Sequence, residues 1–166
     1  MGMSRTLTAT VVVAAVLTAT ALGTAQAATA GSAAPSACRP ANHLAKIAQD
    51  RSSAGHLHFR VTLTAPRGYA PCTLAGSPAD LSFSGHGRTL PVTAGWYGDQ
   101  NATVTFGPGR PVHFDIQVPD TGRTTPADEA SFTLRAPDGM IPGTSVAEGA
   151  FAVTKGTLIG PVQPGA

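Results

Sequence analysis

Nine consecutive residues, His56 to Thr64, alternate between polar and apolar side chains, and no other pattern in the chain limits the possible folds so strongly. In an extended strand, alternate side chains point to opposite faces, so the run has one apolar and one polar face. The apolar face carries Leu57, Phe59, Val61 and Leu63. A strand with one buried and one solvated face is typical of an antiparallel sheet.

A second alternating run covers residues 110–118, and shorter apolar runs recur along the rest of the chain. Turns rich in proline and glycine separate these runs, and the sequence contains 19 Gly and 14 Pro. Shorter strands are expected at residues 43–49, 79–84, 88–93, 103–106, 131–135 and 150–154, and residues 158–159 continue the last of these. This spacing predicts an all-β fold, a two-sheet β-sandwich of about seven or eight strands, with a closed barrel as the alternative.

Two of these strands are expected at sheet edges. Residues 43–49 read as a first, edge strand, although the spacing of Leu44 and Ile47 also fits a short helix. Pro91 predicts an edge position for residues 88–93 because proline cannot donate to a strand ladder. Three segments are expected to lack strands: a loop with the one tryptophan at 95–101, a polar loop at 119–129 and a connection at 144–149.

The first 27 residues have the pattern of an export signal. Arg5 supplies a positive charge, an apolar stretch follows, and Ala25-Gln26-Ala27 fits a small-x-small cleavage site. The apolar stretch is shorter than a stable membrane span of about 20 residues. We therefore expect a signal peptide at 1–27, a disordered spacer at 28–37 and a domain at 38–163, secreted from the cell.

The chain has two cysteines, Cys38 and Cys72. In an exported protein, two cysteines favour a disulfide over a metal site or a redox pair, and two free thiols are the alternative. A bridge that closes a loop of about 34 residues would stabilise the fold by roughly 3–4 kcal/mol through the lost entropy of the unfolded chain.

The charge balance argues against nucleic acid as a partner. Once Arg5 leaves with the leader, ten dispersed Lys and Arg residues remain beside nine acidic ones. Phosphate binding needs a concentrated basic face, which this sequence does not have.

The segment Pro71-Cys72-Thr-Leu-Ala-Gly76-Ser77-Pro78, with an earlier cysteine and a following apolar strand, resembles the actinobacterial secreted proteins of domain-of-unknown-function family 4232. The resemblance runs from Cys38 towards the C-terminus. It implies an immunoglobulin-like antiparallel sandwich outside the cell, a disulfide between Cys38 and Cys72, and no assigned activity. The chain departs from the family at Ser77, where an aromatic residue is usual, and it has no second cysteine pair and no late tryptophan.

Few residues have a pattern suited to ligand binding or catalysis. His56, His58 and His113 face outwards on alternating strands and are candidate metal ligands. Trp96 and Tyr97 are candidates for stacking on a sugar. The acids of the loop at 119–129 are candidates for calcium; they are Asp120, Asp128 and Glu129.

A Gly-x-Ser-x-Gly nucleophile motif is missing from the sequence, although a Ser/His/Asp set can assemble in space from any sequence order. We therefore expect a structural or protein-interaction module that is not an enzyme and needs no cofactor. Its expected partner is an extracellular protein or a cell-envelope component, and binding of a metal or a glycan is the alternative.

Overall fold

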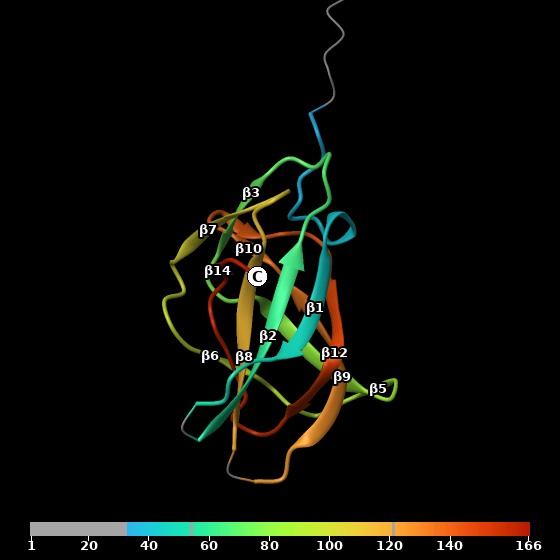
Figure 1. The fold of residues 1–166 in the computed structure, drawn as a ribbon, viewed down its shortest axis with the longest axis vertical. Helices are drawn as coiled ribbons and strands as arrows, with labels where there is room; N and C mark the ends of the chain where they lie inside the picture. The colour runs from blue at the N-terminus through green and yellow to red at the C-terminus, as the bar shows by residue number, and fades with distance from the viewer. Residues whose placement is uncertain (1–32, 54, 121) are drawn as a thin grey trace, which may run out of the picture. The chain divides into compact units, whose positions relative to one another are not determined.

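The computed structural model describes residues 33–166, apart from Ala54 and Thr121 (Figure 1). The predicted signal peptide and the first half of the predicted spacer lie outside these residues. Within the described part of the chain, no helix is long and apolar enough to cross a membrane. The elements are η1 (Pro40–Asn42), β1 (Leu44–Gln49), β2 (His56–Thr64), β3 (Cys72–Ala75), β4 (Ala79–Gly85), β5 (Arg88–Thr89), β6 (Gly95–Trp96), β7 (Thr103–Phe106), β8 (Val112–Pro119), β9 (Thr125–Thr133), β10 (Arg135–Ala136), β11 (Gly139–Met140), β12 (Ser145–Val153), β13 (Leu158–Ile159) and β14 (Gln163–Pro164).

One large sheet contains most of these strands, in the order β5-β4-β9-β12-β1-β2-β8-β13-β6, with β14 also paired to β8. The pairs β3–β7 and β10–β11 form two smaller ladders. Strand β5 stands at one end of the order, the edge position predicted for residues 88–93, but it ends at Thr89 and Pro91 lies outside it. The edge position predicted for the first strand is wrong: β1 lies inside the sheet, antiparallel to β2 and parallel to β12.

The two alternating runs are neighbours in this sheet. Strand β2 has the bounds predicted from the sequence, and it pairs with β8 in an antiparallel ladder from His56↔Pro119 to Leu63↔Val112. The apolar side chains of both strands face the core, and every second residue of β8, starting at Val112, is buried. The outward faces of β2 and β8 therefore form one continuous polar surface.

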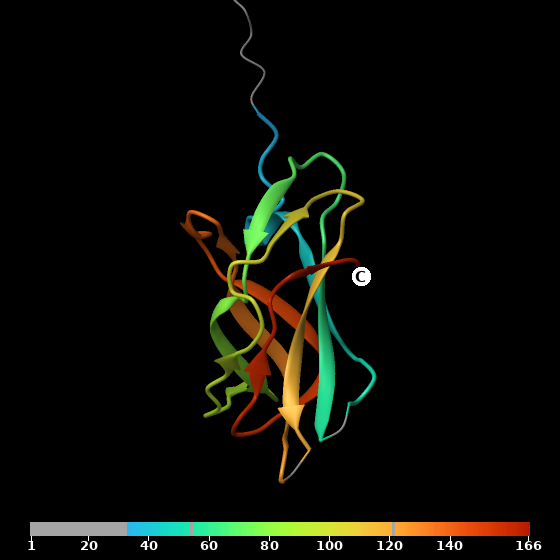
Figure 2. The same cartoon turned by 90° about the vertical axis from the view of Figure 1, so that its left-hand side faces the viewer.

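The main sheet curls so that strands far apart in its order face each other (Figure 2). Contacts between phenylalanine rings identify these strands. Phe114 on β8 packs edge-to-face on Phe132 of β9, with ring centroids 5.0 Å apart, although β8 and β9 are not neighbours in the strand order. Phe151 on β12 contacts both Phe59 of β2 and Phe83 of β4. The fold is thus all-β, as the sequence predicted, and its curled sheet surrounds a phenylalanine-rich core. The immunoglobulin-like sandwich stays a prediction.

All three segments predicted to be strand-free are partly strand. Strand β6 covers Gly95–Trp96, at the start of the expected tryptophan loop at 95–101. Strand β9 begins at Thr125, inside the expected loop at 119–129, and β12 begins at Ser145, inside the expected connection at 144–149. Both strands pair with each other along most of their length, and their register shifts between Glu148 and Phe151. This bulge contains Gly149, and it interrupts the alternation that would have identified β12 in the sequence.

The predicted disulfide is present. Cys38 and Cys72 are bonded with an S–S distance of 2.03 Å, so the segment before β1 is tied to the start of β3. The domain also begins earlier than the predicted boundary: Ala37 is buried, and its backbone N–H donates to the carbonyl of Ala70 at 2.9 Å. These bonds order residues that the sequence assigns to the spacer.

Candidate functional site

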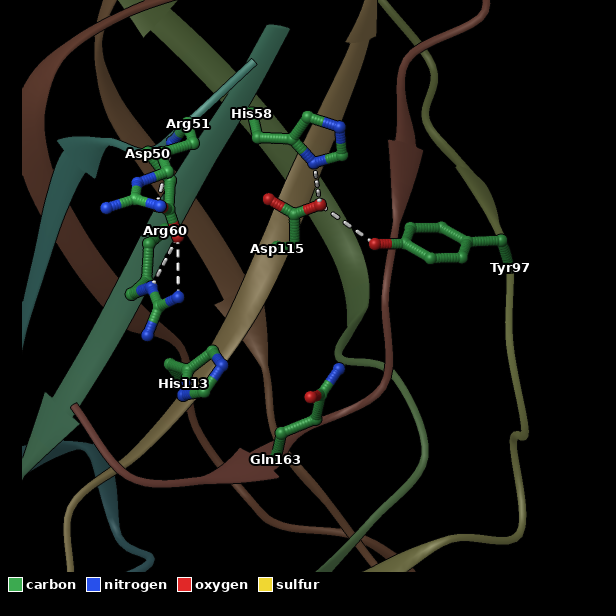
Figure 3. Close-up of a pocket in the computed structure, with 8 residues that line it drawn as sticks. All are labelled: Asp50, Arg51, His58, Arg60, Tyr97, His113, Asp115 and Gln163. Carbon is green, nitrogen blue, oxygen red and sulfur yellow. Dashed lines mark hydrogen bonds and ion pairs between the residues drawn. The ribbon is translucent and has the colours of Figure 1, made fainter. Parts of the chain in front are cut away.

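A polar hollow of about 240 Å³ opens on the outward face of β2 and β8 (Figure 3). Its floor comes from the polar residues of the two alternating strands, and the sides come from the turn after β1, the loop after β6 and the last strand. The residues that line it are Asp50, Arg51, His58, Arg60, Tyr97, His113, Asp115 and Gln163. The alternation that buries the apolar side chains of β2 and β8 places the polar ones here.

Asp115 is the central acceptor of this hollow. Its Oδ2 atom accepts hydrogen bonds from Nδ1 of His58 at 2.6 Å and from the hydroxyl of Tyr97 at 2.8 Å. In the strand register His58 is opposite Gln117, so its ring reaches diagonally across the ladder to Asp115. Figure 3 shows the His58 ring and the Tyr97 hydroxyl converging on this carboxylate from two directions.

The hydrogen-bond chain continues from His58 to a serine. Nε2 of His58 accepts a hydrogen bond from the hydroxyl of Ser53 at 2.7 Å. Ser53 lies on the tight turn between β1 and β2, where its backbone N–H donates to the carbonyl of His56 at 3.1 Å. The structure therefore joins serine, histidine, aspartate and tyrosine in one chain.

An ion pair occupies the other side of the hollow. Arg60 donates to Oδ2 of Asp50 from Nε at 2.8 Å and approaches the same atom with a second guanidinium nitrogen at 2.6 Å. The backbone N–H of Arg51 donates to the other oxygen of Asp50 and, together with Arg60, lowers the pKa of that carboxyl. The charges of Asp50 and Arg60 thus neutralise each other on this side of the hollow.

The pKa of Tyr97 is shifted upwards, first because its phenol is partly removed from water and second because the hydroxyl donates to Asp115. Both causes keep Tyr97 protonated, so it acts as a hydrogen-bond donor and not as a base. The last residues of the chain border the hollow as well: Arg60 donates to the carbonyl of Ala166 and His113 donates to that of Gly165.

The structure brings two of the three predicted metal ligands to this hollow. His58 and His113 line it, whereas His56 lies beside His58 with its ring centroid 6.5 Å away and does not line it. Both ring nitrogens of His58 already have partners. Among residues 33–166, leaving out the two undescribed positions, no three His, Cys, Asp or Glu side chains are grouped so that they could hold a metal ion.

The side chains of the two predicted sugar-stacking residues lie in different surroundings. Tyr97 turns into the hollow and bonds to Asp115, whereas Trp96 is 56% exposed and donates from Nε1 to the carbonyl of Pro78 at 3.2 Å. Of the acids considered for calcium, Glu129 lies within β9 and Asp128 accepts a hydrogen bond from the backbone N–H of His86.

Sequence reasoning missed the chain of Ser53, His58 and Asp115. It placed the two strand residues on outward faces, which is where they lie, but the sequence does not state that β2 and β8 are neighbours in this register. Pairing the two alternating runs with each other would have placed His58 near Asp115. The turn that presents Ser53 to the ring has no comparable sequence signal.

Comparisons with known proteins identify a domain family and nothing closer. A family model described as "Domain of unknown function (DUF4232)" matches residues 38–158, which is most of the chain. Searches of curated proteins and of solved structures give no match. The match spans the disulfide, the alternating strands and every residue that lines the hollow except Gln163, and the chain therefore belongs to the DUF4232 family.

Proposed function

We propose that this chain is an exported protein of an actinobacterium that works outside the cell as a structural or interaction module. The disulfide supports this proposal because such bridges persist in oxidising compartments. The leader pattern of residues 1–27 supports it independently. Intact mass of the protein from culture medium tests it: a chain that starts at Ala28 and has two fewer hydrogens than its reduced form is expected, and retention of the full chain in the cytoplasm would contradict export.

The observation that carries the interaction role is the exposed indole of Trp96. Large aromatic side chains that stay exposed are enriched at the energetic centres of protein interfaces. Trp96 stands on β6, at one end of the sheet order, and its bond to Pro78 holds the indole in place. Little side-chain entropy is then lost when a partner covers the ring, which favours binding. This role requires no chemical reaction.

The expected partner is an extracellular protein or a cell-envelope component, and the same ring is the candidate for a glycan. The experiment measures binding of labelled domain to isolated cell envelopes of the producing bacterium. Trp96→Ala is expected to weaken binding at least ~10-fold, since removal of a central aromatic at an interface costs about 2 kcal/mol or more. Leu44→Ala is the matched control, because Leu44 is similarly exposed, at 63%, on a different part of the sheet.

Equal binding by both variants and the unmodified protein would remove Trp96 from the proposal. Where the envelopes bind the domain, digestion of envelope protein and of envelope glycan in separate samples shows which component is bound.

The metal alternative is tested by titration with zinc or copper ions. A high-affinity site that is lost in His58→Ala would support it, and identical titrations of the two proteins would remove it.

We also propose that the curled sheet is an immunoglobulin-like sandwich. Strand β1 divides the sheet order into β5-β4-β9-β12 and β2-β8-β13-β6, and the contact of Phe114 with Phe132 supports two halves packed face to face. A crystal structure compared strand by strand with immunoglobulin domains tests this assignment, and a sheet whose halves do not face each other would contradict it.

A further inference from the structure

The hydrogen bonds around His58 determine which of its nitrogens carries the proton. Asp115 Oδ2 is the acceptor for both Tyr97 and His58, so Nδ1 of the neutral imidazole is the protonated nitrogen. Nε2 then has a free electron pair, and this pair faces the hydroxyl of Ser53 at 2.7 Å. A base oriented by a carboxylate and placed against a hydroxyl is the arrangement that activates a serine nucleophile.

We propose that Ser53 is a nucleophile for small polar carboxylic esters, with His58 as its general base and Asp115 as the group that positions His58. The inference goes beyond the binding role proposed from Trp96 and shares no residue with it. It is the alternative to the sequence-based expectation that the chain is not an enzyme, and the experiment below decides between the two.

The reaction follows from the tautomer of His58. Ser53 Oγ attacks the ester carbonyl carbon while Nε2 takes the hydroxyl proton; the bond from the carbonyl carbon to the alcohol oxygen then breaks, and Nε2 returns the proton to the departing alkoxide. Water attacks the acyl-serine and gives a proton to Nε2, and that proton passes to Oγ as the carboxylic acid leaves. Ester and water are thus converted to acid and alcohol.

The solvent exposure of Ser53, His58 and Asp115 suits their proposed roles as nucleophile, base and positioning group. Ser53 is exposed on its turn, so a substrate can reach it, whereas the side chains of His58 and Asp115 are each only 19% exposed and keep their alignment out of bulk water. The hydroxyl of Tyr97 donates to the same oxygen of Asp115 as the imidazole does, from another direction. Asp115 on β8 and Tyr97, just after β6, therefore hold the imidazole of His58 on β2 in place.

The hollow indicates the substrate class. His58 lines the hollow and is the hydrogen-bond partner of Ser53, so the proposal places the acyl group of the substrate at the border of this hollow. Its volume of about 240 Å³ and its polar lining favour a short acyl group over a long lipid chain. Arg51, His113 and Gln163 supply polar and cationic contacts, which suit an acyl group that bears oxygen atoms.

The hydrogen bond of the Ser53 backbone N–H limits the expected rate of ester turnover. The N–H of Ser53 already donates to the carbonyl of His56, so it does not stabilise an oxyanion on the substrate. One oxyanion-hole donor contributes about 10²–10³-fold to turnover in serine hydrolases. We therefore expect slow turnover of esters, and acylation that is easiest to detect with activated reagents.

The experiment uses the exported, oxidised chain and two probes, a fluorophosphonate that labels activated serines and 4-nitrophenyl acetate. Peptide mass spectrometry is expected to locate the label on Ser53. Ser53→Ala should remove this label, and His58→Gln should lower the labelling rate by about 10²-fold, the lower end of the contribution of a general base. Ser52→Ala is the matched control, because Ser52 is exposed on the same turn and should label like the unmodified protein.

Two further readouts separate the chemistry from a structural hydrogen bond. Labelling should fall at acid pH, because a protonated imidazole cannot accept the hydroxyl proton, and 4-nitrophenyl acetate should acylate faster than the decanoate ester. Labelling of the unmodified protein no faster than Ser53→Ala, with both folded by circular dichroism, would overturn the proposal. A decanoate ester that reacts as fast as the acetate would overturn the substrate class.

Discussion

At the scale of single residues, the buried His43, just before β1, makes the stability of the domain depend on pH. His43 is only 8% exposed; its Nδ1 donates to the carbonyl of Ala37 at 3.0 Å, and Nε2 accepts from the hydroxyl of Ser145 at 3.0 Å. Burial lowers the pKa of His43 from the ordinary 6.5, because the surroundings disfavour a charged ring, and hydrogen bonds to backbone carbonyls oppose this only in part. The neutral ring thus links the disulfide segment to β12.

We predict that this histidine makes the domain less stable in mild acid. Because its pKa is lower folded than unfolded, the unfolded chain binds more protons as pH falls below 6.5, and the free energy of unfolding drops until the folded pKa is passed. The loss is about 1.4 kcal/mol for each unit between the two pKa values. Urea unfolding at pH 7 and pH 5 measures it, and His43→Gln should show a smaller difference; an equal difference would contradict the assignment.

The positions of the side chains in the candidate site were only partly predictable from the sequence. Alternation correctly placed His58 and Asp115 on solvent-facing sides of their strands, because that pattern depends on nothing but the pleat. Their contact depends on which strands become neighbours, and the contribution of Ser53 depends on the shape of one turn. Neither is encoded in the local pattern around these residues.

At the scale of elements, long alternating strands were predictable and short or interrupted ones were not. Strand β2 has nine residues whose own pattern defines it, whereas β5, β6, β10, β11, β13 and β14 have two residues each and exist only because a partner lies beside them. Strand β12 was shortened in the prediction because Gly149 reads as a turn residue. In the structure it forms a bulge that keeps β12 beside both β9 and β1.

Gly149→Ala is predicted to destabilise this element strongly. Gly149 has a φ of +157°, and an added Cβ would lie 2.1 Å from the carbonyl oxygen of Ile47 on β1. Backbone strain alone costs about 1–3 kcal/mol, and the clash adds to it. Chemical denaturation measures the loss. Gly122→Ala is the control, since nothing lies within 4 Å of its added Cβ, and a loss as large in this variant would contradict the explanation.

At the scale of the whole molecule, one covalent link adds to the curled sheet. The Cys38–Cys72 bridge spans 34 positions and joins the entry to β1 with the β3–β7 ladder, which stands outside the main strand order. The sequence predicted this bridge from cysteine count and export alone. It did not predict that residues before Cys38 are also bonded to the domain, because a small polar segment has no periodicity to reveal such contacts.

Removal of the bridge is predicted to cost about 3–4 kcal/mol, the loop entropy that it takes from the unfolded chain. The double variant Cys38→Ser/Cys72→Ser should unfold at a lower urea concentration than the oxidised protein, and the reduced unmodified protein should match it. If reduction leaves the urea midpoint unchanged, the bridge does not stabilise the domain.

The place of β1 between β2 and β12 has a consequence for the order of assembly. A chain that emerges N-terminus first presents β1 with one side unpaired until residues beyond Ser145 have appeared, about 100 positions later along the sequence. A nascent fragment that lacks β12 therefore displays an open strand to its surroundings, where it is prone to aggregate or to be held by chaperones. The main sheet can therefore be completed only after β12 is available, which is compatible with the export proposed above if the chain folds after crossing the membrane.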